Sequence, residues 1–349
     1  MAQINKPNQY FNTIIYTGDG TTKTITGVGF QPDFVWGKGR NSVSEHALID
    51  SVRGATKKLN SDGTGAEVTN ATSFLTGFTS DGYTVDSTSN FNVNTRTQVN
   101  WNWLASNTSG SSNTDGTITS TVSANTTSGF SIVSYAGTGS NATVGHGLNS
   151  LPGMVIVKGR NTTSTNHWFV FHKNSQSSYS ASGSAILLLN ETNAVDTIGV
   201  GGVWNNTSPT SSVFNIGTAS GVNESGKDFI AYCFAEKQGF SKFGSYTGNG
   251  SADGTFVFTG MKPAFVLLKN TTGDNWTMLD NKRNTYNPES ARLLANQNLA
   301  EASSETLDFL SNGFKCRRTD AGENGSGITY IYMAFAEEPL VGDNPATAR

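Results

Sequence analysis

Three stretches of the sequence open with the same pattern, and this repetition limits the chain to folds made of three similar units. The openings are Phe11–Gly20, Phe130–Gly139 and Phe240–Gly250. Each contains a tyrosine two residues before a Gly-x-Gly turn, and these tyrosines are 119 and then 111 residues apart. That spacing is too long for a solenoid repeat and matches a small domain. We therefore expect three related domains in tandem.

Further blocks recur after each opening. The second block covers residues 29–40, 148–160 and 260–269. The third block covers residues 46–50, 168–172 and 276–280, and the closing block covers residues 99–105, 229–235 and 330–336. These short runs are rich in Val, Ile, Phe, Trp and Tyr and are bounded by Gly, Asn, Asp or Pro, which predicts strands. Helix is indicated only over Pro288–Ala295, with Asn287 as the N-cap. The predicted fold class is all-β, with three tandem β-sandwich (jelly-roll-like) domains related by internal repetition.

The predicted boundaries follow the repeats. Residues 1–106 form the first sandwich with a short N-terminal arm, residues 107–236 the second, and residues 237–349 the third with a C-terminal tail. A Ser/Asn/Gly-rich stretch at 106–113 is typical of a flexible linker, whereas only residues 236–239 separate the second and third copies. We therefore expect copies 2 and 3 to pack rigidly and copy 1 to be looser.

Local signals add detail to the predicted strands. Asp81-Gly82 and Asn312-Gly313 lie between apolar pairs and predict tight hairpins. Aligning the ends of the closing runs places Trp103, Cys233 and Ala334 at one position. The two cysteines, Cys233 and Cys316, are far apart in apparent strands, which favours reduced core residues over a disulfide or a zinc site.

Composition narrows the classes of function. Charged residues make up only 14% of the 349 residues, and 23 basic against 26 acidic side chains disfavour a nucleic-acid binder. Aromatic residues reach 10%, which excludes a disordered chain. No run approaches the ~20 apolar residues of a membrane helix, and the first residues lack a signal-peptide core. We expect synthesis in a reducing cytoplasm without membrane insertion.

The search for chemistry predicts no catalytic residue, no metal site and no cofactor. The histidines His46, His146, His167 and His172 lack a metal-ligand spacing, and His46 takes the place of Trp168 and Trp276 in the other copies, which favours packing. There is no Gly-x-Ser-x-Gly elbow and no P-loop. The Gly-x-Gly turns at 18–20 and 248–250 could offer oxygens to Ca²⁺, but the carboxylates expected of such a site are missing.

One set of charged residues recurs in this weakly charged chain. Lys38, Lys158 and Lys269 close the second strand of each copy, and Asp-x-x-Arg pairs close the third strand in copies 1 and 3, as Asp50 with Arg53 and Asp280 with Arg283. One interpretation is a repeated contact with an anion or saccharide. The favoured one is structural: buried Lys–Asp or Asp–Arg bridges that hold adjacent strands in register.

Several long motifs resemble a known family. They are Ser120–Tyr135, Thr143–Leu148, Gly244–Gly254 and Asp308–Lys315, with Asp50–Thr56 and Phe78–Tyr83 in the first copy. These motifs resemble the repeat units of a virion protein family of tailed bacteriophages, of marine or cyanobacterial type, often labelled tail fibre or structural protein. The resemblance implies a virion location and no enzyme activity, and it supplies no catalytic residues.

The sequence therefore predicts a non-enzymatic virion component. The favoured role is a tail fibre or other host-contacting fibre that binds a cell-surface glycan or protein. The alternatives are a capsid decoration or knob protein with a purely structural role and, more remotely, a depolymerase of surface polysaccharide. Expected partners are other tail or capsid proteins and copies of the same chain, with a trimer favoured.

Overall fold

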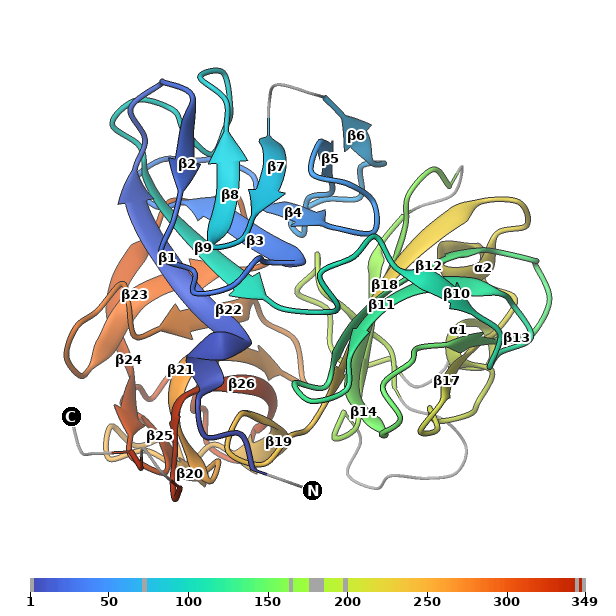
Figure 1. The fold of residues 1–349 in the computed structure, drawn as a ribbon. Helices are drawn as coiled ribbons and strands as arrows, with labels where there is room; N and C mark the ends of the chain where they lie inside the picture. The colour runs from blue at the N-terminus through green and yellow to red at the C-terminus, as the bar shows by residue number, and fades with distance from the viewer. Residues whose placement is uncertain are drawn as a thin grey trace.

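The fold of the chain is nearly all-β (Figure 1). The computed structural model describes residues 3–70, 74–162, 166–175, 185–196, 200–342 and 345–346. In the order of the chain, residues 1–106, 107–236 and 237–349 are called segments 1, 2 and 3 below. The strands of the three segments gather into three lobes around a common centre, blue to teal, green to yellow, and orange to red. The all-β prediction is confirmed.

Segment 1 is built on a four-stranded antiparallel sheet with an inner and an outer face. Its order is β1 (Phe11–Thr17), β9 (Thr97–Trp103), β3 (Phe34–Gly39) and β4 (Ala47–Asp50). A smaller sheet of β2 (Lys23–Ile25), β8 (Gly82–Val85) and β7 (Leu75–Thr79) belongs to the same segment, as does the pair β5 (Lys57–Lys58) and β6 (Val68–Thr69). The 3-10 helix η1 (Pro7–Gln9) precedes β1. The predicted hairpin at Asp81-Gly82 is confirmed, because β7 pairs with β8 there.

Segment 2 contains a seven-stranded antiparallel sheet. Its order is β10 (Ser111–Asn113), β11 (Ser120–Asn125), β12 (Phe130–Ala136), β18 (Asp228–Ala235), β14 (Pro152–Gly159), β15 (Trp168–His172) and β16 (Leu187–Leu188). A second sheet pairs β13 (Ala142–Gly145) with β17 (Val213–Ile216). The short helices α1 (Val200–Trp204) and α2 (Ser220–Asn223) complete the segment. Part of the expected linker is thus strand β10, and Asn107 N donates to Asp33 of segment 1.

Segment 3 contains an eight-stranded antiparallel sheet. Its order is β19 (Ser241–Thr247), β26 (Thr329–Pro339), β21 (Met261–Asn270), β22 (Trp276–Asp280), β23 (Glu289–Leu294), β24 (Ala302–Leu310), β25 (Gly313–Cys316) and β20 (Phe256–Phe258). Because β21 also packs against β24 and β25, the sheet curls into a nearly closed barrel. The hairpin at Asn312-Gly313 is confirmed.

The helix predicted over Pro288–Ala295 is wrong. Residues Glu289–Leu294 form strand β23, which pairs with β22 and β24. Burial alternates along this strand with the period of two that a strand has, not the period of a helix. Pairing with two neighbouring strands outweighs a helix propensity that is worth only tenths of a kcal/mol per residue.

Four strands have the same order in every segment. The orders β1-β9-β3-β4, β12-β18-β14-β15 and β19-β26-β21-β22 correspond strand by strand. The registers correspond as well, since Phe34 pairs with Asp50, Met154 with His172 and Phe265 with Asp280. We call residues that take the same place in these registers equivalent.

The closing strands show that the predicted alignment is wrong by one residue in two copies. The partners of Phe34, Met154 and Phe265 on these strands are Trp103, Phe234 and Phe335. Trp103 is therefore equivalent to Phe234 and Phe335, not to Cys233 and Ala334. A shift of one residue places a side chain on the other face of a sheet. Cys233 and Cys316 are buried free thiols, as predicted.

The middle strands of each segment, β3, β14 and β21 among them, are buried on both faces. On the outer faces lie three separate apolar clusters, one confined to each segment, so each segment is sandwich-like. The inner faces meet in one central core to which all three segments contribute. Its aromatic members include Phe11, Phe34, Trp36, Trp101, Trp103, Phe130, Trp168, Tyr232, Phe234, Phe240, Phe243, Phe265, Trp276 and Phe335.

The N-terminal arm belongs to the same packed body. Ile4 is buried in the central core, and its N–H donates to Gln238 O of segment 3. Of the predicted terminal arms, residues 1–2, 343–344 and 347–349 lie outside the described residues. Within the described ranges, no helix is long and apolar enough to cross a membrane.

Candidate functional site

The three recurring lysines are buried and bind main-chain carbonyl groups. Lys38 Nζ donates to Asn298 O at 3.2 Å, and Lys269 Nζ donates to Thr192 O at 3.1 Å, so each lysine reaches into another segment. Lys158 Nζ donates to Asn166 O within its own segment. Burial lowers the pKa of Lys158 to about 7 and that of Lys38 and Lys269 to about 8. The lysines thus contact carbonyl groups where a Lys–Asp bridge was expected.

The first Asp-x-x-Arg pair lies where segment 1 meets segment 2. Arg53 Nε lies 2.5 Å from Asp50 Oδ2, and both side chains are fully buried. Tyr232 of segment 2 donates its hydroxyl to the same carboxylate oxygen at 2.8 Å. Glu67 completes the cluster by bridging Arg53, at 3.2 Å, and Arg160 of segment 2, at 2.9 Å. This cluster therefore joins two segments.

The second pair repeats this geometry between segments 3 and 1. Arg283 Nε lies 2.6 Å from Asp280 Oδ2, and both side chains are again fully buried. Trp101 of segment 1, which is equivalent to Tyr232, donates Nε1–H to the same oxygen at 2.9 Å. Glu301 bridges Arg283, at 3.0 Å, and Arg40 of segment 1, at 2.8 Å. Sequence reasoning found the pair but missed both bridging glutamates, which are not near it in the chain.

The junction between segments 2 and 3 is built from neutral groups at the equivalent places. His172 stands where the other junctions have aspartate, and its Nε2 donates to Tyr332 O at 3.1 Å. Burial lowers the pKa of His172 to about 4, so the ring is neutral at pH 7. Val195 N donates to Thr271 O, just as Glu301 N donates to Arg40 O at the junction of segments 3 and 1. The place of the aspartate is thus filled by a neutral group, and the ion pair of Lys242 with Glu236 links the two segments at another point.

A ring N–H donor explains why His46 stands where the other two segments have tryptophan. His46 Nε2 donates to Leu294 O at 2.9 Å, Trp168 Nε1 to Asn60 O at 2.7 Å, and Trp276 Nε1 to Leu188 O at 2.9 Å. Each acceptor lies in another segment. The position was predicted to be a packing site, and it is buried, but it also carries a hydrogen bond that histidine and tryptophan can both supply.

No metal centre is found in the ranges that the structure describes: no three His, Cys, Asp or Glu side chains there converge on one point. In the Gly18-Asp19-Gly20 turn, Asp19 accepts hydrogen bonds from Thr21 and lies 2.9 Å from Lys23 Nζ. The hydrogen bond from Lys23 is the main cause of the lowered pKa of Asp19. The carboxylate of Asp19 is thus already paired with Lys23 of the same chain.

A pocket of about 250 Å³ opens on segment 1 beside the end of β3. Its polar lining includes Lys38, Ser44, Glu45, Lys58, Asn90, Arg96 and Gln98, and its apolar lining includes Val43, Ala47 and Phe91. Lys58 Nζ lies 3.0 Å from Glu45 Oε2 at the rim. Three cations against one carboxylate give the lining an excess of positive charge.

Small residues of segment 1 create this pocket. Ala47 is equivalent to Phe169 and Thr277, and Gln98 is equivalent to Phe229 and Tyr330. In segment 2, Phe229 stacks on Tyr135 at 5.2 Å, and in segment 3, Tyr330 stacks on Tyr246 at 4.9 Å. Segment 1 thus has an alanine and a glutamine where segment 2 has two phenylalanines, so space remains open.

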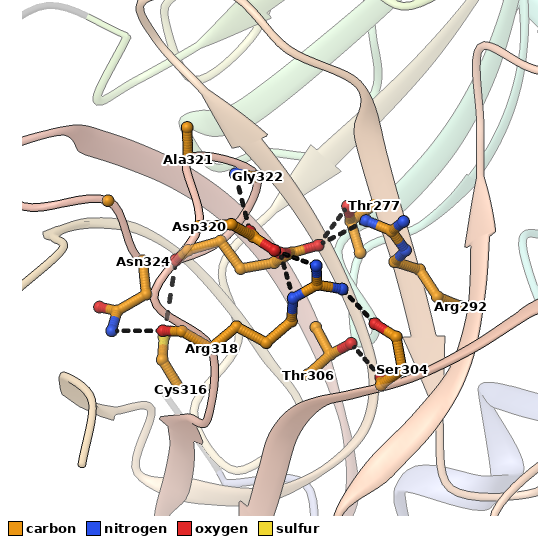
Figure 2. A network of polar contacts seen from close by, with 12 residues as sticks. Thr277, Arg292, Ser304, Thr306, Cys316, Arg318, Asp320, Ala321, Gly322 and Asn324 are labelled. Carbon is orange, nitrogen blue, oxygen red and sulfur yellow. Dashed lines mark hydrogen bonds and ion pairs between the residues drawn. The ribbon is translucent and has the colours of Figure 1, made fainter. Parts of the chain in front are cut away.

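A buried carboxylate occupies the corresponding region of segment 3 (Figure 2). Glu323 is 0% exposed, and its Oε1 accepts hydrogen bonds from Thr277 Oγ1 and Arg292 Nη1, both at 3.1 Å. Arg318 lies between Asp320 and Ser304 in Figure 2 and is ion-paired with Asp320. Burial, aided by Asp320, raises the pKa of Glu323 to about 7.

The place of Glu323 is apolar in the other two segments. This place is identified by three equivalent tyrosines, each of which donates its hydroxyl to the main-chain oxygen of the residue there. The bonds are Tyr16 to Phe91 O, Tyr135 to Val222 O and Tyr246 to Glu323 O, at 2.8, 2.7 and 2.6 Å. The side chains of Phe91 and Val222 belong to the outer apolar clusters of their segments. The fold therefore accepts an apolar residue here, and the carboxylate is a property of segment 3 alone.

The raised pKa of Glu323 predicts a pH-dependent stability. The folded pKa of about 7 exceeds the ordinary value of 4.5, so the folded state binds the proton more tightly than the unfolded state does. This contribution is complete below pH 4.5 and is lost as the pH rises through 7, a change of about 3 kcal/mol in the free energy of unfolding. Urea titrations at pH 4.5 and pH 8 should show that Glu323→Gln removes this dependence. The exposed Glu305→Gln is the control, and a wild-type dependence retained by Glu323→Gln would contradict the prediction.

Fold and site together define an all-β protein of three interlocked sheet segments, with a basic pocket on segment 1. Residues 6–339 match the family described as a domain of unknown function, DUF7483, and the chain belongs to that family. No curated protein matches the sequence.

Proposed function

We propose that the chain consists of three copies of one β-sandwich unit, with boundaries near residues 106 and 236. The matching strand orders and registers support this. The contacts between segments support it further, because equivalent residues link segment 1 to 3, segment 3 to 2 and segment 2 to 1. Three copies arranged in this closed cycle form one body with an approximate threefold axis, not three independent beads.

On this architecture we propose a non-enzymatic virion component, a tail fibre or other host-contacting fibre protein. The observation that carries the proposal is the use of the recurring charges. Asp50, Arg53, Asp280 and Arg283 are buried at junctions between segments, where they build a rigid body instead of facing a substrate. The resemblance of the repeated motifs to phage virion proteins supports the proposed virion location. The pocket on segment 1 supplies a place for a host ligand.

Cryo-electron microscopy of the intact virion tests this proposal. We expect density for the closed three-segment body on the tail, with the pocket of segment 1 facing away from its attachment point. Density at capsid lattice positions would overturn the fibre role and favour a decoration protein. Shortening of host polysaccharide by the purified protein, followed by size-exclusion chromatography, would overturn the non-enzymatic role.

A further inference from the structure

We infer that the pocket on segment 1 binds a carboxylated sugar residue, such as a uronate of a surface polysaccharide, with Arg96 holding the carboxylate. This inference rests on the proposed host-contacting role. It starts from the four charged groups that line the pocket, Lys38, Lys58, Arg96 and Glu45. Their balance favours an anionic ligand over a neutral or cationic one.

Arg96 is the cation that is available to a ligand. Lys38 Nζ already donates to Gly39 O, Ser44 Oγ and Asn298 O, and Lys58 Nζ is paired with Glu45. Arg96 is half-buried and, within the described residues, has no carboxylate partner. A guanidinium presents two parallel N–H groups that match the two oxygens of a carboxylate.

The rest of the lining suits a small polyhydroxylated ring. Gln98 Nε2 donates to Asn90 O at 3.1 Å, and the exposed side-chain amide of Asn90 is available to hydroxyl groups. Val43 and Ala47 offer apolar surface for the C–H face of a ring. The volume of about 250 Å³ lies just below the range of drug-sized pockets, which fits one sugar residue.

The position of the pocket also fits a ligand site. The equivalent region is closed in segment 2 by Phe169, whose ring packs against Gly221, and in segment 3 the buried Glu323 network occupies it. This space is thus filled in segments 2 and 3 and open in segment 1, where the Arg96 guanidinium has no carboxylate partner in the part of the chain that the structure describes.

Calorimetric titration of the full chain tests the inference with three probes. Methyl glucuronide carries both the ring and the carboxylate, methyl glucoside carries only the ring, and acetate carries only the carboxylate. We expect the glucuronide to bind about tenfold or more tightly than either of the others. Equal binding of the glucoside would overturn the carboxylate contact, equal binding of acetate would overturn the sugar, and no binding of the glucuronide would overturn both.

Two variants locate the binding. Arg96→Gln should weaken glucuronide binding about tenfold or more, because a charge-assisted bidentate contact is lost. Ala47→Phe, which places in segment 1 the residue of segment 2, should block the pocket without removing a charge. Arg317→Gln, which removes an exposed guanidinium of segment 3 that is paired with the buried Asp308, is the matched control and should bind normally. Unchanged binding by both pocket variants would overturn the site, while the location of the protein on the virion is measured separately by microscopy.

Discussion

Replacing Trp103 by alanine should lower the free energy of unfolding by about 3–5 kcal/mol, the usual cost of removing a large buried aromatic side chain. Trp103 is fully buried at the centre of the shared core. Its ring contacts the rings of six phenylalanines drawn from all three segments: Phe11, Phe34, Phe130, Phe234, Phe265 and Phe335. The cavity left by the missing indole would therefore destabilise all three segments together. Urea unfolding followed by circular dichroism should show one transition at a lower urea concentration.

A matched substitution separates volume from chemistry at this position. Trp103→Phe places in segment 1 the residue that segments 2 and 3 have as Phe234 and Phe335. It also removes the indole Nε1–H, which is buried without a hydrogen-bond partner among the described residues. Because an unsatisfied buried donor is costly, Trp103→Phe should be much milder than Trp103→Ala. The exposed Tyr286→Ala serves as a surface control, and equal losses for both Trp103 variants would contradict the role of the core.

Replacing Asp50 by asparagine should cost about 3–5 kcal/mol of stability, because it leaves the buried Arg53 guanidinium without its main counter-charge. Asp50 also accepts the hydroxyl of Tyr232, so the junction between segments 1 and 2 loses two contacts at once. Asp280→Asn should have the same effect at the junction of segments 3 and 1, where Trp101 takes the part of Tyr232. Differential scanning calorimetry measures both losses.

The neutral junction around His172 suggests the control for these variants. Since the neutral His172 takes the place of Asp50 at that junction, Asp50→Asn combined with Arg53→Met should recover much of the stability lost in Asp50→Asn alone. Glu45→Gln, which removes an exposed carboxylate from the largely buried Lys58, should cost less stability than Asp50→Asn, because the Asp50 carboxylate is fully buried. Binding of methyl glucuronide should be unaffected in the folded Asp50→Asn protein. Lost binding at unchanged stability would instead make Asp50 part of a ligand site.

Much of the fold follows from local signals in the sequence. The repeats at Tyr16, Tyr135 and Tyr246 predict the strands that the structure contains, because short apolar runs between turn residues carry their own signal. The Asp-x-x-Arg spacing likewise predicts two buried bridges, since Arg53 and Arg283 reach back to a carboxylate three residues earlier. Strand β23 is the exception, because its state depends on pairing with β22 and β24 and not on the helix propensity of its own residues.

The arrangement of the segments could not be read from the sequence in the same way. Nothing local to Glu67 or Glu301 indicates that each bridges two arginines from different segments. The pocket was missed for a related reason. It arises because the side chains of Ala47 and Gln98 are less bulky than those of their equivalents in segment 2. This difference is seen only when the strand registers are used to align the three segments.

The closed cycle of segments has a consequence for how the chain reaches its native state. Phe11 stacks on Phe335 at 5.1 Å, and Arg40 pairs with Glu301, 261 positions later in the chain. Contacts between such distant residues are slow to form, because a long loop must first be closed. During synthesis, strand β1 must therefore wait for strand β26, and the ring of Phe11 has no contact with Phe335 until residues more than 300 positions later have been made.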